Sequence, residues 1–160
     1  MKQKLQTWLP ALPAVIIMCI IFAFSSAEAR ESSGSSTGFS RFLVRTESFL
    51  FGKHWDEEEI LFYAEKIEGG VRKCAHITEY MALALSVGFF LMTRKLNELR
   101  VVFYSVLFSV LYAASDEFHQ LFVAGRSGKS ADVVIDSLGA VFGVMLLILI
   151  NESRVRKGIR

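Results

Sequence analysis

Cysteine is scarce in this sequence, with Cys19 and Cys74 the only two among 160 residues. They do not form a C-x-x-C pair, which excludes a thiolate zinc site, and they lie in separate apolar runs, where a disulfide between them is geometrically unfavourable. Ser115 and Ser130, which lie beside the charged residues, lack a Gly-x-Ser-x-Gly context, so serine-hydrolase chemistry has little support. The net charge is only +2, and the basic residues are not interleaved with aromatic residues along one face. This pattern argues against nucleic acid as a partner.

Apolar residues are abundant and are gathered into four blocks. They make up 52% of the chain, and the mean hydropathy is positive. The first block is free of charge over twenty residues, 8–27, which is long enough to cross a bilayer core of roughly 30 Å. We therefore predict an all-α fold, an integral membrane four-helix bundle. It forms a single domain over residues 1–160, with spanning helices at about 8–27, 71–93, 101–121 and 131–151.

Basic residues predict the topology of this bundle. The amino terminus, the 93–100 connection and the tail together hold nine Lys/Arg against two acids, whereas the longer remaining segments hold nine among fourteen acids. Positive residues favour the cytoplasmic side of short loops, so both termini are predicted to be cytoplasmic. A competing interpretation is that the first block is a signal peptide cleaved near Ala27-Glu28-Ala29; it too leaves the following segment outside the cytoplasm.

Residues 28–70 are predicted to form an extracytoplasmic segment containing short amphipathic helices. Residues 32–38 are a Ser/Gly run typical of a flexible linker. Apolar residues at helical spacing predict a helix over about 39–50, which lies either in the lipid headgroup region or over the mouth of the bundle. A second short helix is predicted to begin after Asp56 as N-cap and to end at Gly69-Gly70.

Ionisable residues are concentrated at two places beside the apolar runs, residues 72–80 and 116–136. A charge at the bilayer centre costs roughly 2.5–3.5 kcal/mol on insertion scales, so such groups are functional-site candidates. The uncharged parts of the last three helices are only about 14 or 15 residues long, roughly 21–22 Å, so their charged ends must complete the span. Antiparallel alternation brings those ends to the same leaflet, the outer one. We predict that six side chains converge there: His76, Glu79, Asp116, His119, Asp132 and Asp136.

Helical spacing supports this convergence. His76 with Glu79, Asp116 with His119, and Asp132 with Asp136 lie three or four residues apart, so each pair is predicted to share a helix face. Three cations join the cluster, and they nearly balance its carboxylates: Arg72, Lys73 and Arg126 against Glu79, Asp116, Glu117, Asp132 and Asp136. In the last helix Gly139 and Gly143 form a small-xxx-small pattern, which allows a neighbouring helix to approach closely.

Several short motifs along the chain resemble those of the VanZ-like family of small bacterial membrane proteins. They are Phe24-Ser25-Ser26, Arg72-Lys73-x-x-His76-x-x-Glu79-Tyr80, Asp116-Glu117-x-His119-Gln120, Gly125-Arg126 and Asp132-x-x-x-Asp136-x-x-Gly139. Each motif alone is weak, but five in this order on four membrane helices are specific. At the position of Asp136 the family often has asparagine. The resemblance implies a multi-pass protein of the bacterial plasma membrane and a part in low-level resistance to teicoplanin-type glycopeptides in Gram-positive bacteria.

Three functions are open for the charged site. In the first, it binds or transports an anionic lipid or lipid-linked envelope intermediate, or a lipoglycopeptide, with Arg72, Lys73 and Arg126 holding phosphate. The second is an intramembrane enzyme acting on a phospholipid or polyprenyl phosphate. The third is a buried charge network with a purely structural role.

For the enzymatic hypothesis the candidate catalytic residues are His76, Asp116, His119 and Asp132. A supporting network is predicted from Glu79, Tyr80, Glu117, Gln120 and Asp136. A divalent metal is a variant of this hypothesis, because paired histidine and carboxylate ligands from facing helices suit first-row metals. Its candidate ligands are His76, Glu79, Asp116, His119 and Asp132.

Overall fold

The computed structural model describes residues 7–26, 29–126 and 128–158. Within them the chain forms a short 3-10 helix, η1 (Leu9–Ala11), followed by the α-helices α2 (Leu12–Ser26), α3 (Ala29–Leu50), α4 (Glu57–Thr93), α5 (Glu98–Gln120) and α6 (Ser130–Arg156). Four stretches are long and apolar enough to cross a membrane: Leu9–Ser26, Glu57–Thr93, Glu98–Gln120 and Ser130–Arg156. The predicted all-α fold class with four membrane-length helices is therefore confirmed.

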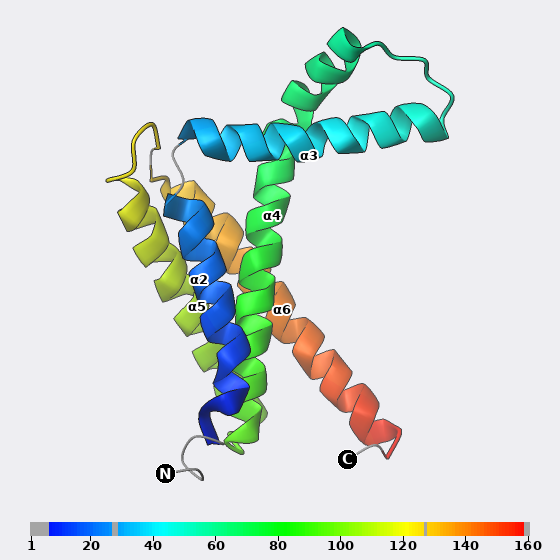
Figure 1. The fold of residues 1–160 in the computed structure, drawn as a ribbon. Helices are drawn as coiled ribbons and strands as arrows, with labels where there is room; N and C mark the ends of the chain where they lie inside the picture. The colour runs from blue at the N-terminus through cyan, green and yellow to red at the C-terminus, as the bar shows by residue number, and fades with distance from the viewer. Residues whose placement is uncertain (1–6, 27–28, 127, 159–160) are drawn as a thin grey trace.

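The helices α2, α4, α5 and α6 form a bundle, and α3 lies across one end of it (Figure 1). The start of η1 and the end of α6 lie at the opposite end. Helix α4 is central and contacts each of the other α-helices. Its buried Tyr80 and Leu83 pack in one cluster with Ile21 of α2 and Ala113 of α5. The charged ends of the helices thus gather at the end that α3 crosses.

Close contact between α4 and α6 depends on two glycines. A Cβ atom at Gly139 would overlap the backbone carbonyl of Ile77, and one at Gly143 would overlap the backbone carbonyl of Met81. Both glycines are buried. The small-xxx-small pattern in the last helix therefore serves the approach of α6 to α4, as in other tightly packed membrane helices.

The first half of α4 differs from the sequence-based expectation. The predicted N-cap is correct: the side chain of Asp56 accepts a hydrogen bond of 2.8 Å from the backbone N–H of Glu59, and the Glu59 side chain accepts one of 3.1 Å from the backbone N–H of Asp56. The predicted end at Gly69-Gly70 is wrong, because α4 continues through both glycines and is 37 residues long in all. A glycine costs about 1 kcal/mol in a helix interior, and packing against α3 before the pair and against the bundle after it outweighs that cost.

Helix α3 also begins earlier than predicted. The Ser/Gly run 32–38 lies inside this helix, so the prediction of a flexible linker is wrong. The predicted amphipathic helix over 39–50 is confirmed as its second half. Helix propagation from a packed segment is much less costly than nucleation, which explains how serines of middling propensity continue the helix. The proposed cleavage site at 27–29 falls mainly on Ala27 and Glu28, which lie outside the described residues.

Candidate functional site

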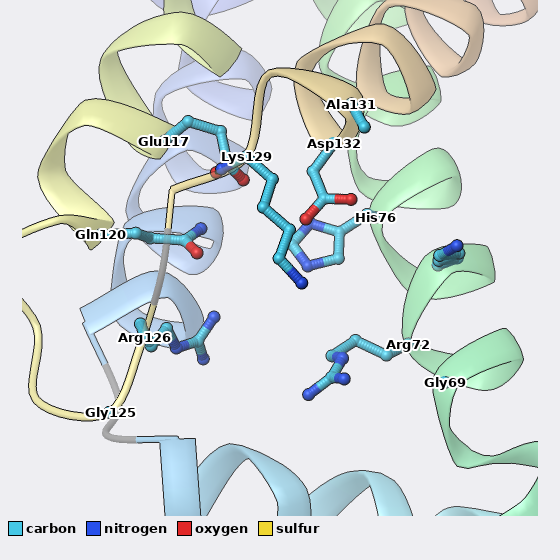
Figure 2. Close-up of a pocket in the computed structure, with 11 residues that line it drawn as sticks. Gly69, Arg72, His76, Glu117, Gln120, Gly125, Arg126, Lys129, Ala131 and Asp132 are labelled. Atoms are coloured by element: carbon cyan, nitrogen blue, oxygen red, sulfur yellow. The ribbon is translucent and has the colours of Figure 1, made fainter.

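A cavity of about 390 Å³ opens at the end of the bundle beside α3 (Figure 2). Its wall comes from α4, the end of α5, the start of α6 and Gly125, Arg126 and Lys129 of the loop before α6. The lining residues are Gly69, Arg72, Lys73, His76, Glu117, Gln120, Gly125, Arg126, Lys129, Ala131 and Asp132. Seven of the twelve predicted site residues are in this set. We call this space the cationic cavity.

Positive charge dominates the cavity wall. Arg72 and Lys73 come from α4, and Arg126 and Lys129 come from the loop before α6, against two carboxylates from Glu117 and Asp132. The side chains of Arg72, Arg126 and Lys129 point toward the centre of the cavity (Figure 2). The sequence predicted a nearly balanced cluster. The cavity wall is instead cationic, because Lys129 joins it while Glu79, Asp116 and Asp136 are not among its lining residues.

Arg126 connects this wall to the end of α2. Its guanidinium donates a hydrogen bond of 2.9 Å to the backbone carbonyl of Phe24. Burial lowers the pKa of Arg126, and the positive charge of Arg72 lowers it further, while the carboxylates of Asp116 and Glu117 oppose this shift. Arginine nevertheless stays protonated in proteins. Two neighbouring guanidinium groups therefore repel each other across the cavity, and an anion between them would relieve that repulsion.

The carboxylates of α5 hold the cavity wall in place. Buried Glu117 accepts a hydrogen bond of 2.7 Å from the backbone N–H of Lys129, which ties the loop to α5. Buried Gln120 donates through Nε2 to Asp116 Oδ2 at 3.1 Å. Asp116 is thus placed behind the wall, where it still lies close enough to His76 and Glu79 to interact with them electrostatically.

A second layer of polar groups lies one helical turn further into the bundle. The Nδ1 atom of His76 is 3.8 Å from Asp136 Oδ1 and 4.0 Å from Glu79 Oε2. Asp136 is 1% exposed and Tyr80 is 0% exposed. Among the residues that the structure describes, neither Asp136 oxygen nor the Tyr80 hydroxyl has a hydrogen-bond partner, and the same holds for His76 Nδ1. Unpaired buried polar groups are costly. The polar atoms of this layer, directly behind the cavity, can therefore still accept or donate hydrogen bonds.

His119 does not belong to the cavity wall, contrary to the predicted convergence. Its ring stacks on Phe22 of α2 with centroids 4.9 Å apart, and its Nε2 atom lies 3.2 Å from the hydroxyl of Ser26. Residues three apart on a helix diverge by about 60° around its axis. In α5 that angle separates Asp116, buried behind the cavity wall, from His119, which packs on α2.

A family model described as VanZ/LLP1 matches residues 11–151 of the chain. The chain belongs to the VanZ/LLP1 family. No curated protein and no solved structure matched it. The resemblance suggested by the five motifs is therefore confirmed, and the match includes every residue of the cationic cavity and of the polar layer behind it.

The residues that the structure describes do not support the metal variant of the enzymatic hypothesis. Over the described parts of the chain, no three His, Cys, Asp or Glu side chains come together in a way that could hold a metal ion. His119 faces α2, Asp116 is bonded to Gln120, and Asp132 belongs to the cavity wall. The five candidate ligands therefore do not form one set, although His76 and Asp132 share the cavity wall and His76 lies 4.0 Å from Glu79.

Two contributions to the site were missed at the sequence level. Lys129 was not singled out, although it lies three residues after Arg126 in the same short turn and immediately before a spanning helix. The end of α2 was noted only as a motif, yet it supplies the Phe24 carbonyl to Arg126 and the Ser26 hydroxyl to His119. A basic residue next to an apolar run is the signal that identifies Lys129; no sequence signal identifies a backbone carbonyl as an acceptor.

Proposed function

We propose that this VanZ/LLP1 family member binds the phosphate of an anionic membrane lipid or lipid-linked envelope intermediate in the cationic cavity. The observation that carries the proposal is the excess of positive charge, Arg72, Lys73, Arg126 and Lys129 against two carboxylates, at the end of four membrane-length helices. Arginine binds phosphate through paired donors. A cavity of about 390 Å³ is within the usual size of small-molecule sites.

The site is proposed to face the outer leaflet of a bacterial plasma membrane, with both termini in the cytoplasm. The distribution of Lys and Arg supports this orientation. The start of η1 and the end of α6 lie together at the end of the bundle opposite α3, which agrees with an even number of spans (Figure 1). The family resemblance implies resistance to teicoplanin-type glycopeptides. We propose that binding of the anionic lipid at this site contributes to that resistance.

The proposal is tested with full-length protein in phosphatidylcholine nanodiscs and a fluorescent polyprenyl phosphate as the probe. Wild type is expected to bind the phosphate and not the matching neutral polyprenol. Arg126→Lys is expected to weaken binding about tenfold, roughly 1.4 kcal/mol, because lysine lacks the paired donors. Arg154→Lys, at the opposite end of α6, is the matched control and is expected to bind as wild type does. Equal binding of phosphate and polyprenol would refute the proposal.

The link to resistance needs a cellular measurement. Teicoplanin susceptibility is compared between cells carrying wild type, Arg126→Lys and Arg154→Lys, together with the amount of protein in the membrane. Loss of protection by Arg126→Lys at unchanged abundance is the expected result. If protection disappears only when the protein does, the charges have the structural role instead.

A second candidate function rests on the His76–Asp136 pair. His76 lines the cavity, and its Nδ1 atom lies 3.8 Å from a buried carboxylate oxygen. Histidine is the side chain that most often serves as general base. Activation of a water molecule by His76 would make the bound phosphate ester a substrate for hydrolysis. Release of phosphate or headgroup by wild type, abolished in His76→Gln while probe binding persists, would favour this enzyme over a binding protein.

A further inference from the structure

The second half of α3 presents an apolar face that no described part of the chain covers. Phe39, Phe42, Phe49 and Leu50 are 55%, 62%, 86% and 69% exposed. At 100° per residue these side chains lie on one side of the helix. The stripe contains no charged residue. We call it the aromatic face of α3.

The opposite side of the same helix is the one that packs on the protein. Ser40, Val44 and Ser48 are buried, at 0%, 3% and 8% exposed, and they follow each other at intervals of four residues. Val44 packs in a cluster with Ile60 and Ala64 of α4. Helix α3 therefore turns two serines and a valine toward its partner and leaves its most hydrophobic side uncovered, the reverse of an ordinary amphipathic helix in a soluble protein.

Polar contacts hold this orientation. The Arg45 guanidinium donates to both carboxylate oxygens of Glu57 at 2.7 Å. The hydroxyl of Ser48 donates to the backbone carbonyl of Lys53. Lys53 in turn pairs with Glu47 at 2.7 Å. These bonds join α3 to the loop and to the first turn of α4, so α3 is not free to rotate its aromatic face inward.

The place of α3 in the fold identifies what the aromatic face meets. The helix begins three residues after Ser26, where the first spanning stretch ends. It then runs across the bundle instead of along it, and its second half extends beyond α4 (Figure 1). The first turns of α4, which contain Ile60, lie on the far side of α3 from the spanning helices. The aromatic face lies on the opposite side of α3 from Val44 and therefore points away from those turns.

We propose that residues 39–50 of α3 lie in the membrane interface, with the aromatic face inserted between lipid headgroups and acyl chains. Helices that lie in this plane carry bulky apolar residues on one face and charges on the others. Here Arg41, Arg45 and Glu47 supply those charges away from the aromatic face. The occupant of the aromatic face is thus the lipid bilayer rather than another protein. Anchoring α3 there also sets the depth of the cationic cavity, which opens beside it.

The test uses fluorescence quenching of the full-length protein in phosphatidylcholine–phosphatidylglycerol vesicles. Single cysteines are placed at Phe42 or Phe49 in a Cys19→Ser, Cys74→Ser background and labelled with bimane. Glu58→Cys, on the exposed first turn of α4, is the matched control. Lipids with a doxyl group near the headgroup are expected to quench the labels at 42 and 49 several-fold more than the label at 58. Aqueous iodide is expected to show the opposite order.

Two outcomes would overturn the inference. Iodide quenching at 42 and 49 as strong as at 58 would place the aromatic face in water. Weak quenching by both iodide and lipid would place it against protein, such as a second copy of the chain. Phe39→Cys repeats the measurement if either labelled variant melts below the control. The result does not depend on whether the cavity binds phosphate, so the two proposals fail separately.

Discussion

The Nδ1 atom of His76 lies 3.8 Å from Oδ1 of Asp136, between the cationic cavity and the buried layer behind it. His76 is half-buried and lines the cavity, whereas Asp136 is 1% exposed. A ligand in the cavity can therefore reach His76 but not the carboxyl group of Asp136 behind it. The distance exceeds that of a hydrogen bond, and Asp136 finds no hydrogen-bond partner among the described residues.

Replacement of Asp136 by asparagine is expected to preserve or raise stability. Asparagine has the same shape and cannot carry a negative charge, and an unsatisfied buried polar group costs about 1–3 kcal/mol, more when charged. The midpoint of thermal unfolding in detergent is therefore expected to stay the same or to rise by a few degrees. Asp136→Ala, which leaves a void beside His76, serves as the contrast. A clear fall in the midpoint of Asp136→Asn would show that the carboxylate stabilises the fold as an ion pair with His76.

Lys129→Gln is expected to weaken binding of the polyprenyl phosphate probe and to make that binding less sensitive to salt. The side chain points into the cavity (Figure 2), and removing a cation lowers the attraction that salt screens. The backbone N–H of Lys129, which donates to Glu117, is unchanged by the substitution, so stability should be retained. Binding is measured between low and physiological ionic strength. Lys157→Gln, beyond α6 at the opposite end, should match wild type at every salt concentration; a loss there would point to non-specific attraction.

The two histidines of the charged region are expected to give opposite results. His119→Ala removes a stack on Phe22, which is worth about 0.5–1.5 kcal/mol beyond buried area. It should lower the unfolding midpoint and leave probe affinity unchanged in the folded protein. His76→Gln should change probe affinity or turnover with little loss of stability. Both variants are compared by thermal unfolding and by probe binding, and a binding defect confined to His119→Ala would contradict the placement of these residues.

Two glycine substitutions are expected to move stability in opposite directions. Gly143→Ala places a Cβ against the carbonyl of Met81 and should separate α6 from α4, at a cost of about 1–3 kcal/mol or more. Gly70→Ala has open space around the new methyl group and should stabilise α4 by about 0.5–1 kcal/mol. Thermal unfolding of the two variants measures the difference. Destabilisation by Gly70→Ala would contradict the open surroundings and the helical backbone of this glycine.

Much of the fold was predictable because hydrophobicity alone imposes it. Four uncharged runs must each be covered by hydrocarbon, and a backbone there must form helices to satisfy its hydrogen bonds. The shortness of the last three runs placed Arg72, His76 and Asp132 at one end, and the structure brings them to one cavity. The small-xxx-small pattern of Gly139 and Gly143 likewise predicted a close helix contact, although not its partner.

The tertiary structure decided which side of each helix meets which neighbour. Periodicity places Asp116 and His119 near one another on α5. In the structure, however, His119 packs on α2 and Asp116 bonds to Gln120. Similarly, Gly69-Gly70 and the serine run in α3 carry local signals for a break, which contacts between α3 and α4 override. Composition along the chain therefore determined that this is a helical membrane protein with four helices long enough to span a bilayer and with charge at one end. The cavity wall, the inclusion of Lys129 and the exclusion of His119 depend on contacts between segments far apart in sequence, whose energies no local pattern contains.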